Sequence, residues 1–82
     1  EVFMPLTGTW EVFWGPEGER RLTLGPWDTI TIPAGVSRGF RNVGAEDAVL
    51  LGMASGRDPG RINWPEPVRA AARAAGVELP GE

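Results

Sequence analysis

The chain has 82 residues, enough for one small domain, and its 41% hydrophobic and 23% charged residues are typical of a globular protein. Its net charge of −3 argues against nucleic acid as a partner, and no apolar run approaches a membrane span, so we expect a cytoplasmic protein that binds neither nucleic acid nor membrane. It contains neither Cys nor His, which excludes disulfides, thiolate metal sites and histidine-based catalysis within this chain.

The first part of the chain predicts short strands joined by tight turns. In residues 9–14, large apolar side chains alternate with others, which is the pattern of a strand with one buried face. A turn signal at 15–18 and an apolar alternation at 20–24 predict the returning strand of a hairpin. Residues 2–6 also favour a strand, but Pro5 cannot donate to a ladder, which predicts an edge strand or a bulge.

The middle of the chain continues the same pattern. Residues 29–32 alternate cleanly, and residues 36–42 form a less regular strand after the turn at 33–35. After the polar turn at 44–47, residues 48–53 form a continuous apolar run, as expected of a strand buried on both faces. Short strands at this even spacing, separated by Gly and Pro, predict an all-β sandwich or barrel.

The last part of the chain predicts a helix. Pro67 suits the first turn and Gly76 suits the end, and the apolar residues between them recur with helical spacing. These apolar residues are Val68, Ala71, Ala72 and Ala75. We therefore expect a β core over residues 1–54, and over 55–82 a loop and C-terminal helical extension of the same domain.

Two stretches have the spacing of a known pair of motifs. Within residues 25–42, Pro33, Gly35 and Asn42 stand at the offsets of a pattern in which Pro-x-Gly is followed by His and then Asn, and position 38 is Arg where that pattern has His. At the start, Glu1 is followed by six residues and Gly8, as at the end of the companion motif. The chain thus resembles the cupin superfamily over about residues 1–54, and the small single-domain bacterial cupins in particular.

The resemblance implies a partial cupin jelly-roll β-barrel with a short C-terminal helix, and a homodimer. It also implies that this chain begins after the two histidines that precede Glu1 in the family. Trp27 stands where cupins commonly have Gly, and we expect it to be a lid or interface residue.

The metal site of the family is incomplete in this sequence. Glu1 matches the carboxylate ligand, but Arg38 replaces the third histidine, and a guanidinium has no lone pair to offer a metal. We expect no metal and no other cofactor in this chain. A divalent metal is conceivable only if upstream histidines exist in the full-length protein.

Arg38 has two interpretations. If it points into the barrel, it needs a partner, which could be Glu1 or the carboxylate or phosphate of a ligand. If it leans to the barrel mouth, it is solvated. The aromatic side chains Phe3, Trp10 and Phe40 could line the apolar wall of a pocket, or could simply fill the core.

The resulting hypothesis is a small-molecule-binding barrel without a complete metal site, whose ligand is anionic or apolar. The candidate ligand-binding residues are Glu1, Phe3, Trp10, Arg38 and Phe40, and no catalytic residue is assigned. Two alternatives stay open. The chain could be a fragment of a metal-dependent cupin dioxygenase or isomerase, or a filled-barrel module for interaction or dimerisation.

Overall fold

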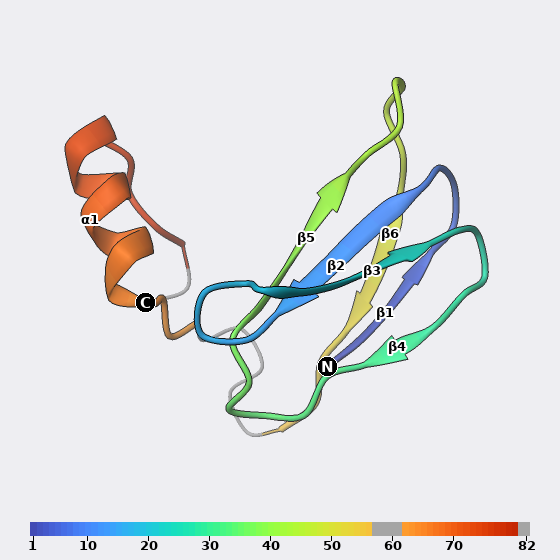
Figure 1. Cartoon of the computed structure of the whole chain (residues 1–82), viewed down its shortest axis with the longest axis horizontal. Coiled ribbons are helices and arrows are strands. Elements are labelled where there is room, and N and C mark those ends of the chain that lie inside the picture. The colour runs from blue at the N-terminus through green and yellow to red at the C-terminus, as the bar shows by residue number, and fades with distance from the viewer. Residues whose placement is uncertain (57–61, 81–82) are drawn as a thin grey trace.

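The computed structural model describes residues 1–56 and 62–80 (Figure 1). It forms two antiparallel three-stranded sheets and one short C-terminal helix, as expected of a mostly β chain. The elements are β1 (Val2–Pro5), β2 (Trp10–Trp14), β3 (Arg20–Leu24), β4 (Ile30–Thr31), β5 (Arg38–Asn42), β6 (Leu50–Met53) and α1 (Glu66–Ala75). We call the sheet ordered β4-β1-β6 the β1 sheet, and the sheet ordered β3-β2-β5 the β2 sheet.

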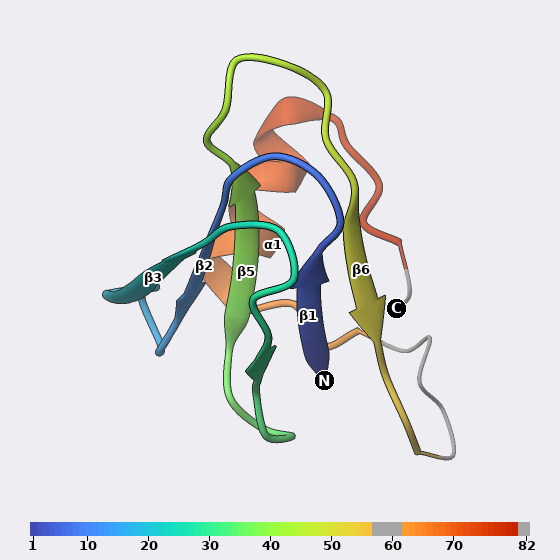
Figure 2. The same cartoon turned by 90° about the vertical axis from the view of Figure 1, so that its right-hand side faces the viewer.

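The two sheets lie opposite each other as an open sandwich, with β2, β3 and β5 on one side of Figure 2 and β1 and β6 on the other. The predicted barrel is not closed. β5 ends the β2 sheet and β6 ends the β1 sheet, and no ladder joins these two strands in the part of the chain that the structure describes. A closed barrel needs every strand paired on both sides. In the described residues the outer edges of β5 and β6 stay unpaired, as do those of β3 and β4, and we call the side with β5 and β6 the open side.

The core is small and lies between the sheets. Its buried members come from both layers: Phe3, Val12, Leu24 and Ile32 are each at most 4% exposed. Alternation along the strands explains why these residues are the buried ones, because every second side chain of a strand points inward. The alternation predicted over residues 9–14 and 29–32 places Val12 and Ile32 among the buried residues.

The predicted hairpin of β2 and β3 is confirmed by its register, which pairs Trp10 with Leu24 and Trp14 with Arg20. Gly15 and Gly18 in the connecting turn have φ of 103° and 68°, a region that glycine enters without steric cost. β2 also pairs with β5 on its other side, so it is the central strand of its sheet.

Pro5 belongs to a central strand, so the prediction of an edge strand or bulge was wrong. β1 pairs with β4 on one side and with β6 on the other. Pro5 is nevertheless tolerated, because β4 is only two residues long and its pairing ends at Phe3. At Pro5 that side of β1 is taken by a turn, and the Pro5 carbonyl accepts a hydrogen bond from the Trp27 N–H at 2.9 Å. The missing N–H therefore removes no ladder bond.

The prediction that residues 48–53 are buried on both faces was also wrong. β6 is an edge strand, and only Leu50 packs against the core. Val49, Leu51 and Met53 are 54%, 37% and 44% exposed. Gly52 pairs with the buried Phe3 and therefore lies on the inner side of the sheet. The residues that alternate with Gly52 along the strand lie on the outer side. A continuous apolar run shows that a strand is apolar on both faces, but not that both faces are covered.

The predicted helix is confirmed in α1. It ends at Gly76, whose φ of 71° lets its own N–H and that of Val77 bond back to the carbonyls of Arg73 and Ala72. None of the residues of α1 is buried, and Figure 1 shows it projecting beyond β5, away from the sandwich core. Among the described residues no helix is long and apolar enough to cross a membrane.

Candidate ligand-binding site

Glu1 lies at the end of the β1 sheet and is held there by backbone bonds. Its nitrogen donates to the Ile32 carbonyl at 2.8 Å, and the Ile32 N–H donates to the Glu1 carbonyl at 2.7 Å. These bonds extend the pairing of β1 and β4 by one residue. Because Glu1 and Phe3 are two residues apart on one strand, the Glu1 side chain points toward the inner side of the sandwich.

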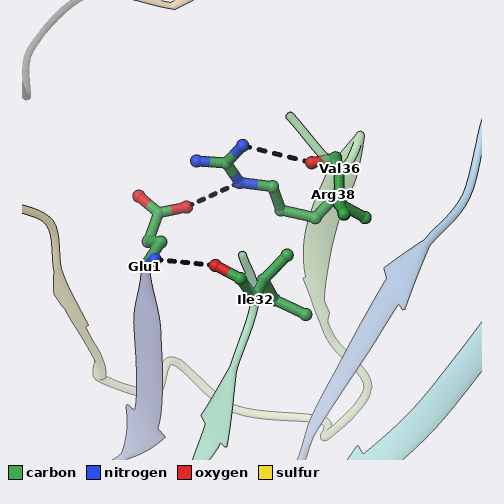
Figure 3. A network of polar contacts seen from close by, with 4 residues as sticks. All are labelled: Glu1, Ile32, Val36 and Arg38. Carbon is green, nitrogen blue, oxygen red and sulfur yellow. Dashed lines mark hydrogen bonds and ion pairs between the residues drawn. The ribbon is translucent and has the colours of Figure 1, made fainter. Parts of the chain in front are cut away.

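Arg38 opens β5 in the opposite sheet and reaches across to Glu1. Its Nε donates to Glu1 Oε1 at 2.9 Å, and its Nη1 donates to the carbonyl of Val36 at 3.1 Å (Figure 3). The side chains of Arg38 and Glu1 are 33% and 26% exposed. The two interpretations of Arg38 are therefore both partly right: it pairs with Glu1, and the pair lies at the partly solvated mouth of the sandwich.

The Arg38 guanidinium keeps donor capacity beyond these two contacts. Figure 3 shows Nη2 without a drawn contact, and among residues 1–56 and 62–80 no oxygen is found that accepts a hydrogen bond from Nη2. A guanidinium offers five N–H donors in a rigid plane, and Glu1 takes only one of them through a single oxygen. The free part of the fork can donate hydrogen bonds to one further anionic oxygen, or to a pair of them.

The three aromatic candidates meet on the inner side of the sandwich. The Phe3 and Phe40 rings lie 5.5 Å apart at 57°, and the Trp10 and Phe40 rings lie 6.1 Å apart at 65°. These are the tilted and edge-on arrangements that aromatic rings favour. Trp10 is fixed by its indole N–H, which donates to the Thr7 carbonyl at 3.0 Å.

Phe40 differs from its two partners in exposure. Phe3 is 4% exposed and belongs to the core, whereas Phe40 is 53% exposed although its ring packs on Phe3. Its pairing with Val12, which is fully buried, shows that Phe40 lies on the inner side of its sheet. The ring is exposed because β5 is the edge strand at the open side of the sandwich. Packing thus explains Phe3, and Phe40 remains available to a ligand.

The five predicted residues therefore form two adjoining groups. Glu1 and Arg38 make the polar group at the mouth, and the three rings make the apolar group. Arg38 and Phe40 connect them, because they are two residues apart on β5 and so point to the same side.

The residues present do not fit a metal. No group of three or more carboxylate, His or Cys side chains comes together in the described ranges 1–56 and 62–80. At the mouth, the carboxylate of Glu1 stands alone, and its Oε1 is engaged by a permanent cation at 2.9 Å. A divalent ion at the same carboxylate would face repulsion from Arg38 and would lack further ligands.

A groove that no sequence pattern indicated lies at the C-terminal end. An open groove of about 670 Å³ runs between α1 and the residues that follow it. Trp64 holds this tail in place, because its indole N–H donates to the Pro80 carbonyl at 2.8 Å. The groove is lined by Arg69, Ala72, Arg73, Val77, Glu78, Leu79 and Pro80. It lies outside the predicted site. It could not be predicted from the sequence, because it forms only when the residues after α1 fold back along the helix.

Trp27, expected as a lid or interface residue, lies in the turn between β3 and β4. It is the one residue other than glycine with a positive φ, 73°, in the part of the chain described, and its side chain is 71% exposed. The turn is fixed by Asp28, whose Oδ2 accepts the Gly25 N–H at 2.9 Å. No contact places Trp27 in the site formed by Glu1, Arg38 and the three rings.

Comparison with known proteins gives no relative for this chain: no family model, no curated protein and no solved structure matches it. Its likeness to cupins consists of the motif offsets around Pro33, Gly35 and Asn42 and the position of Glu1.

Proposed function

We propose that this chain is a small-molecule-binding protein of the cupin type, and that its ligand enters the open side of the sandwich. In this proposal the strands are part of a jelly roll, the protein acts in the cytoplasm, and the site holds no metal. Arg38 binds an anionic group of the ligand, and Phe40 contacts its apolar part.

The observation that carries this proposal is the exposure of Phe40. An aromatic ring on the inner side of a sandwich is ordinarily buried, yet this one is 53% exposed and stands beside a guanidinium with unused donors. An apolar wall with one well-placed charged group is the usual composition of a small-molecule site.

The Glu1 carboxylate limits which ligands fit. It orients the guanidinium and balances part of its charge, since the two atoms that meet are 2.9 Å apart. A polyphosphate would bring more negative charge than Arg38 can balance beside Glu1, whereas a single carboxylate would not. The ligand class that fits is therefore a monoanion with an apolar, preferably aromatic, body.

Benzoate is a suitable probe, with neutral benzamide as its uncharged counterpart. In a titration followed by ¹⁵N-correlated NMR, we expect benzoate to shift the Arg38 Nε–H signal and the Gly39 and Phe40 amides, and benzamide to shift them less. Arg38→Met should abolish the benzoate effect. The pair it removes is partly exposed, so the loss of stability should not exceed about 1 kcal/mol and the variant should fold.

Arg41→Met is the matched control. Arg41 is in the same strand but on the opposite side of the sheet, where its guanidinium lies 5.7 Å from the Phe13 ring centroid. It should bind benzoate like the parent chain. Equal binding by both variants would refute the proposed site, and so would shifts confined to the groove beside α1.

A further inference from the structure

The inner side of the β2 sheet continues from β2 onto its other edge strand, β3. The pairing of these strands places Val12 opposite Leu22 and Trp14 opposite Arg20. Val12 is fully buried between the sheets, so Leu22 also lies on the inner side, and Arg20, two residues away on β3, lies there too. Leu22 is nevertheless 48% exposed. The inner side of β3 is therefore open toward this end of the strand.

Two arginines flank one tryptophan across this inner side. Trp14 of β2 pairs with Arg20 on β3 and with Arg38 on β5. We call these three residues the arginine row. Neighbouring strands lie about 4.8 Å apart, so the Cα atoms of the two arginines are about 10 Å apart. On each edge strand the arginine is two residues from an exposed apolar side chain, which is Phe40 on β5 and Leu22 on β3.

The charge of Arg20 is not balanced by a carboxylate. Within residues 1–56 and 62–80 its guanidinium makes no ion pair and no hydrogen bond. Glu19, its neighbour in the chain, is engaged at the hairpin turn, where Oε2 accepts the Glu17 N–H at 3.1 Å. Arg38, by contrast, is paired with Glu1 at 2.9 Å. Because that pair is neutral overall, Arg20 supplies the one net positive charge that a monoanionic ligand would balance.

Trp14 can contact a ligand that lies between the two arginines. It is half-buried, and its indole N–H has no acceptor in the described ranges of the chain, whereas those of Trp10 and Trp64 donate to carbonyls. An indole ring offers a large apolar surface to an aromatic ligand and one donor at its edge. The row thus combines a ring surface with donors on both sides of it.

We propose that the ligand site continues along the arginine row and that Arg20 determines its specificity, an inference that rests on the proposed function. The anionic group of the ligand binds Arg38, its aromatic body lies over Trp14, and Arg20 donates hydrogen bonds to a second group. Since the two arginines start on opposite sides of Trp14, this second group is at the far end of the body from the anionic group.

The chemistry of the second group follows from the guanidinium and from the charge count. A guanidinium only donates, so the group that it binds must be an acceptor. The single net positive charge of the row and Glu1 is already balanced by the anionic group. The second group is therefore neutral, and the ligand class is an aromatic monoanion with a carbonyl or amide opposite its anionic group.

The test compares benzoate with 4-carbamoylbenzoate, which has the same charge and adds an amide carbonyl opposite the carboxylate. Dissociation constants are measured by NMR titration of ¹⁵N-labelled protein. We expect the parent chain to bind 4-carbamoylbenzoate about fivefold more tightly, through one added hydrogen bond to a charged, solvated donor. Arg20→Met should lower this ratio to about one, while benzoate still shifts the Arg38 Nε–H signal.

Arg21→Met is the matched control. Arg21 follows Arg20 on β3 and pairs with Phe13, so it lies on the outer side of the sheet. Its replacement changes the net charge by the same amount, and the variant should keep the fivefold ratio. Arg20 is exposed and without a partner in the described ranges, so its replacement should leave the fold intact. Arg20→Gln serves as a second variant if Arg20→Met does not fold.

The outcomes separate this inference from the proposed function. Equal affinities of the two probes for the parent chain would overturn the inference alone. A ratio that persists in Arg20→Met, or one that falls equally in Arg21→Met, would do the same. If neither probe binds the parent chain, the inference and the proposed function fail together.

Discussion

Trp27 combines two properties that rarely occur together in one residue. Its φ of 73° lies in the left-handed region, which is costly for a bulky side chain, and that side chain is 71% exposed. Glycine would adopt this conformation without the penalty. The conformation is maintained by the turn, in which Trp27 N–H bonds to Pro5 and Asp28 bonds to Gly25.

Of two replacements of Trp27, by Gly and by Ala, only the one by Gly should therefore stabilise the chain. Trp27→Gly removes the strain, and after the greater flexibility of glycine in the unfolded state is subtracted, we expect a gain of about 0.5–1 kcal/mol. Trp27→Ala keeps the strain and loses the same indole, so it is the control. Urea unfolding followed by the fluorescence of the remaining tryptophans measures both variants. A Trp27→Gly variant no more stable than Trp27→Ala would contradict the account.

The Glu1–Arg38 pair shows how far single residues could be predicted. The motif offsets placed both residues at family site positions, and their pairing was one of the alternatives for Arg38, which the 2.9 Å contact confirms. The exposure of Phe40 could not be predicted in this way. It depends on β5 having no further strand at its edge, which is a property of the assembled sheets and not of the local pattern.

At the scale of the strands, Gly39 in β5 makes room for the Phe13 ring of β2. The two residues are paired, and a Cβ on Gly39 would come within 2.4 Å of the ring. The ring also lies 5.7 Å from the Arg41 guanidinium. The outer side of the β2 sheet is thus organised by an aromatic ring lying over a strand glycine, an arrangement that pins strand register.

Gly39→Ala should displace this ring and destabilise the chain by about 1–2 kcal/mol, because overpacked positions must shift a side chain or the backbone. Gly52→Ala is the comparison within β6, where a Cβ would be 3.6 Å from the nearest Phe3 atom, an ordinary contact. We expect Gly52→Ala to change stability little. Thermal unfolding monitored by circular dichroism measures both, and equal losses of stability in the two variants would contradict this packing.

In α1, the Glu66 carboxylate accepts a hydrogen bond from Arg73 Nη2 at 2.7 Å. This bond and the charge of Arg73 hold the pKa of Glu66 below its usual value. A carboxyl group whose pKa is lower in the folded helix contributes stability above its ordinary pKa, and this contribution is lost as the pH falls through the lowered value.

We therefore expect α1 to lose helicity as the pH falls below the ordinary pKa of glutamate and through the lowered pKa of Glu66, seen in the Cα chemical shifts of its alanines. Both side chains are largely exposed, so the change should be partial and should weaken in high salt. Glu66→Gln should remove most of this pH dependence. The same loss of helicity in Glu66→Gln would show that another group is responsible.

The elements that were predicted wrongly share one physical cause. For β1 and β6, the residue pattern gave the strand and its alternation, but not its place in the sheet. Pro5 suggested an edge, yet β1 pairs on both sides and is central, and Pro5 is tolerated there because the pairing with β4 ends at Phe3. The apolar run of β6 suggested full burial, yet β6 is the edge. Strand order is decided by long-range pairing, which local patterns do not contain.

For the whole molecule, the open side of the sandwich is the central feature. It leaves Phe40 exposed beside Arg38, and the proposed site depends on it. The sequence predicted a mostly β chain of short strands with a short C-terminal helix, and the structure confirms this. It also predicted a partial barrel, and the structure is an open sandwich of two sheets and not a closed barrel.

The most direct test of the binding account is native mass spectrometry of the purified protein, with the metal content measured on the same sample. We predict a small anionic organic molecule bound to the parent chain and to Arg41→Met, and its absence from Arg38→Met. A parent chain free of any bound molecule, or one carrying a stoichiometric transition metal, would contradict the account.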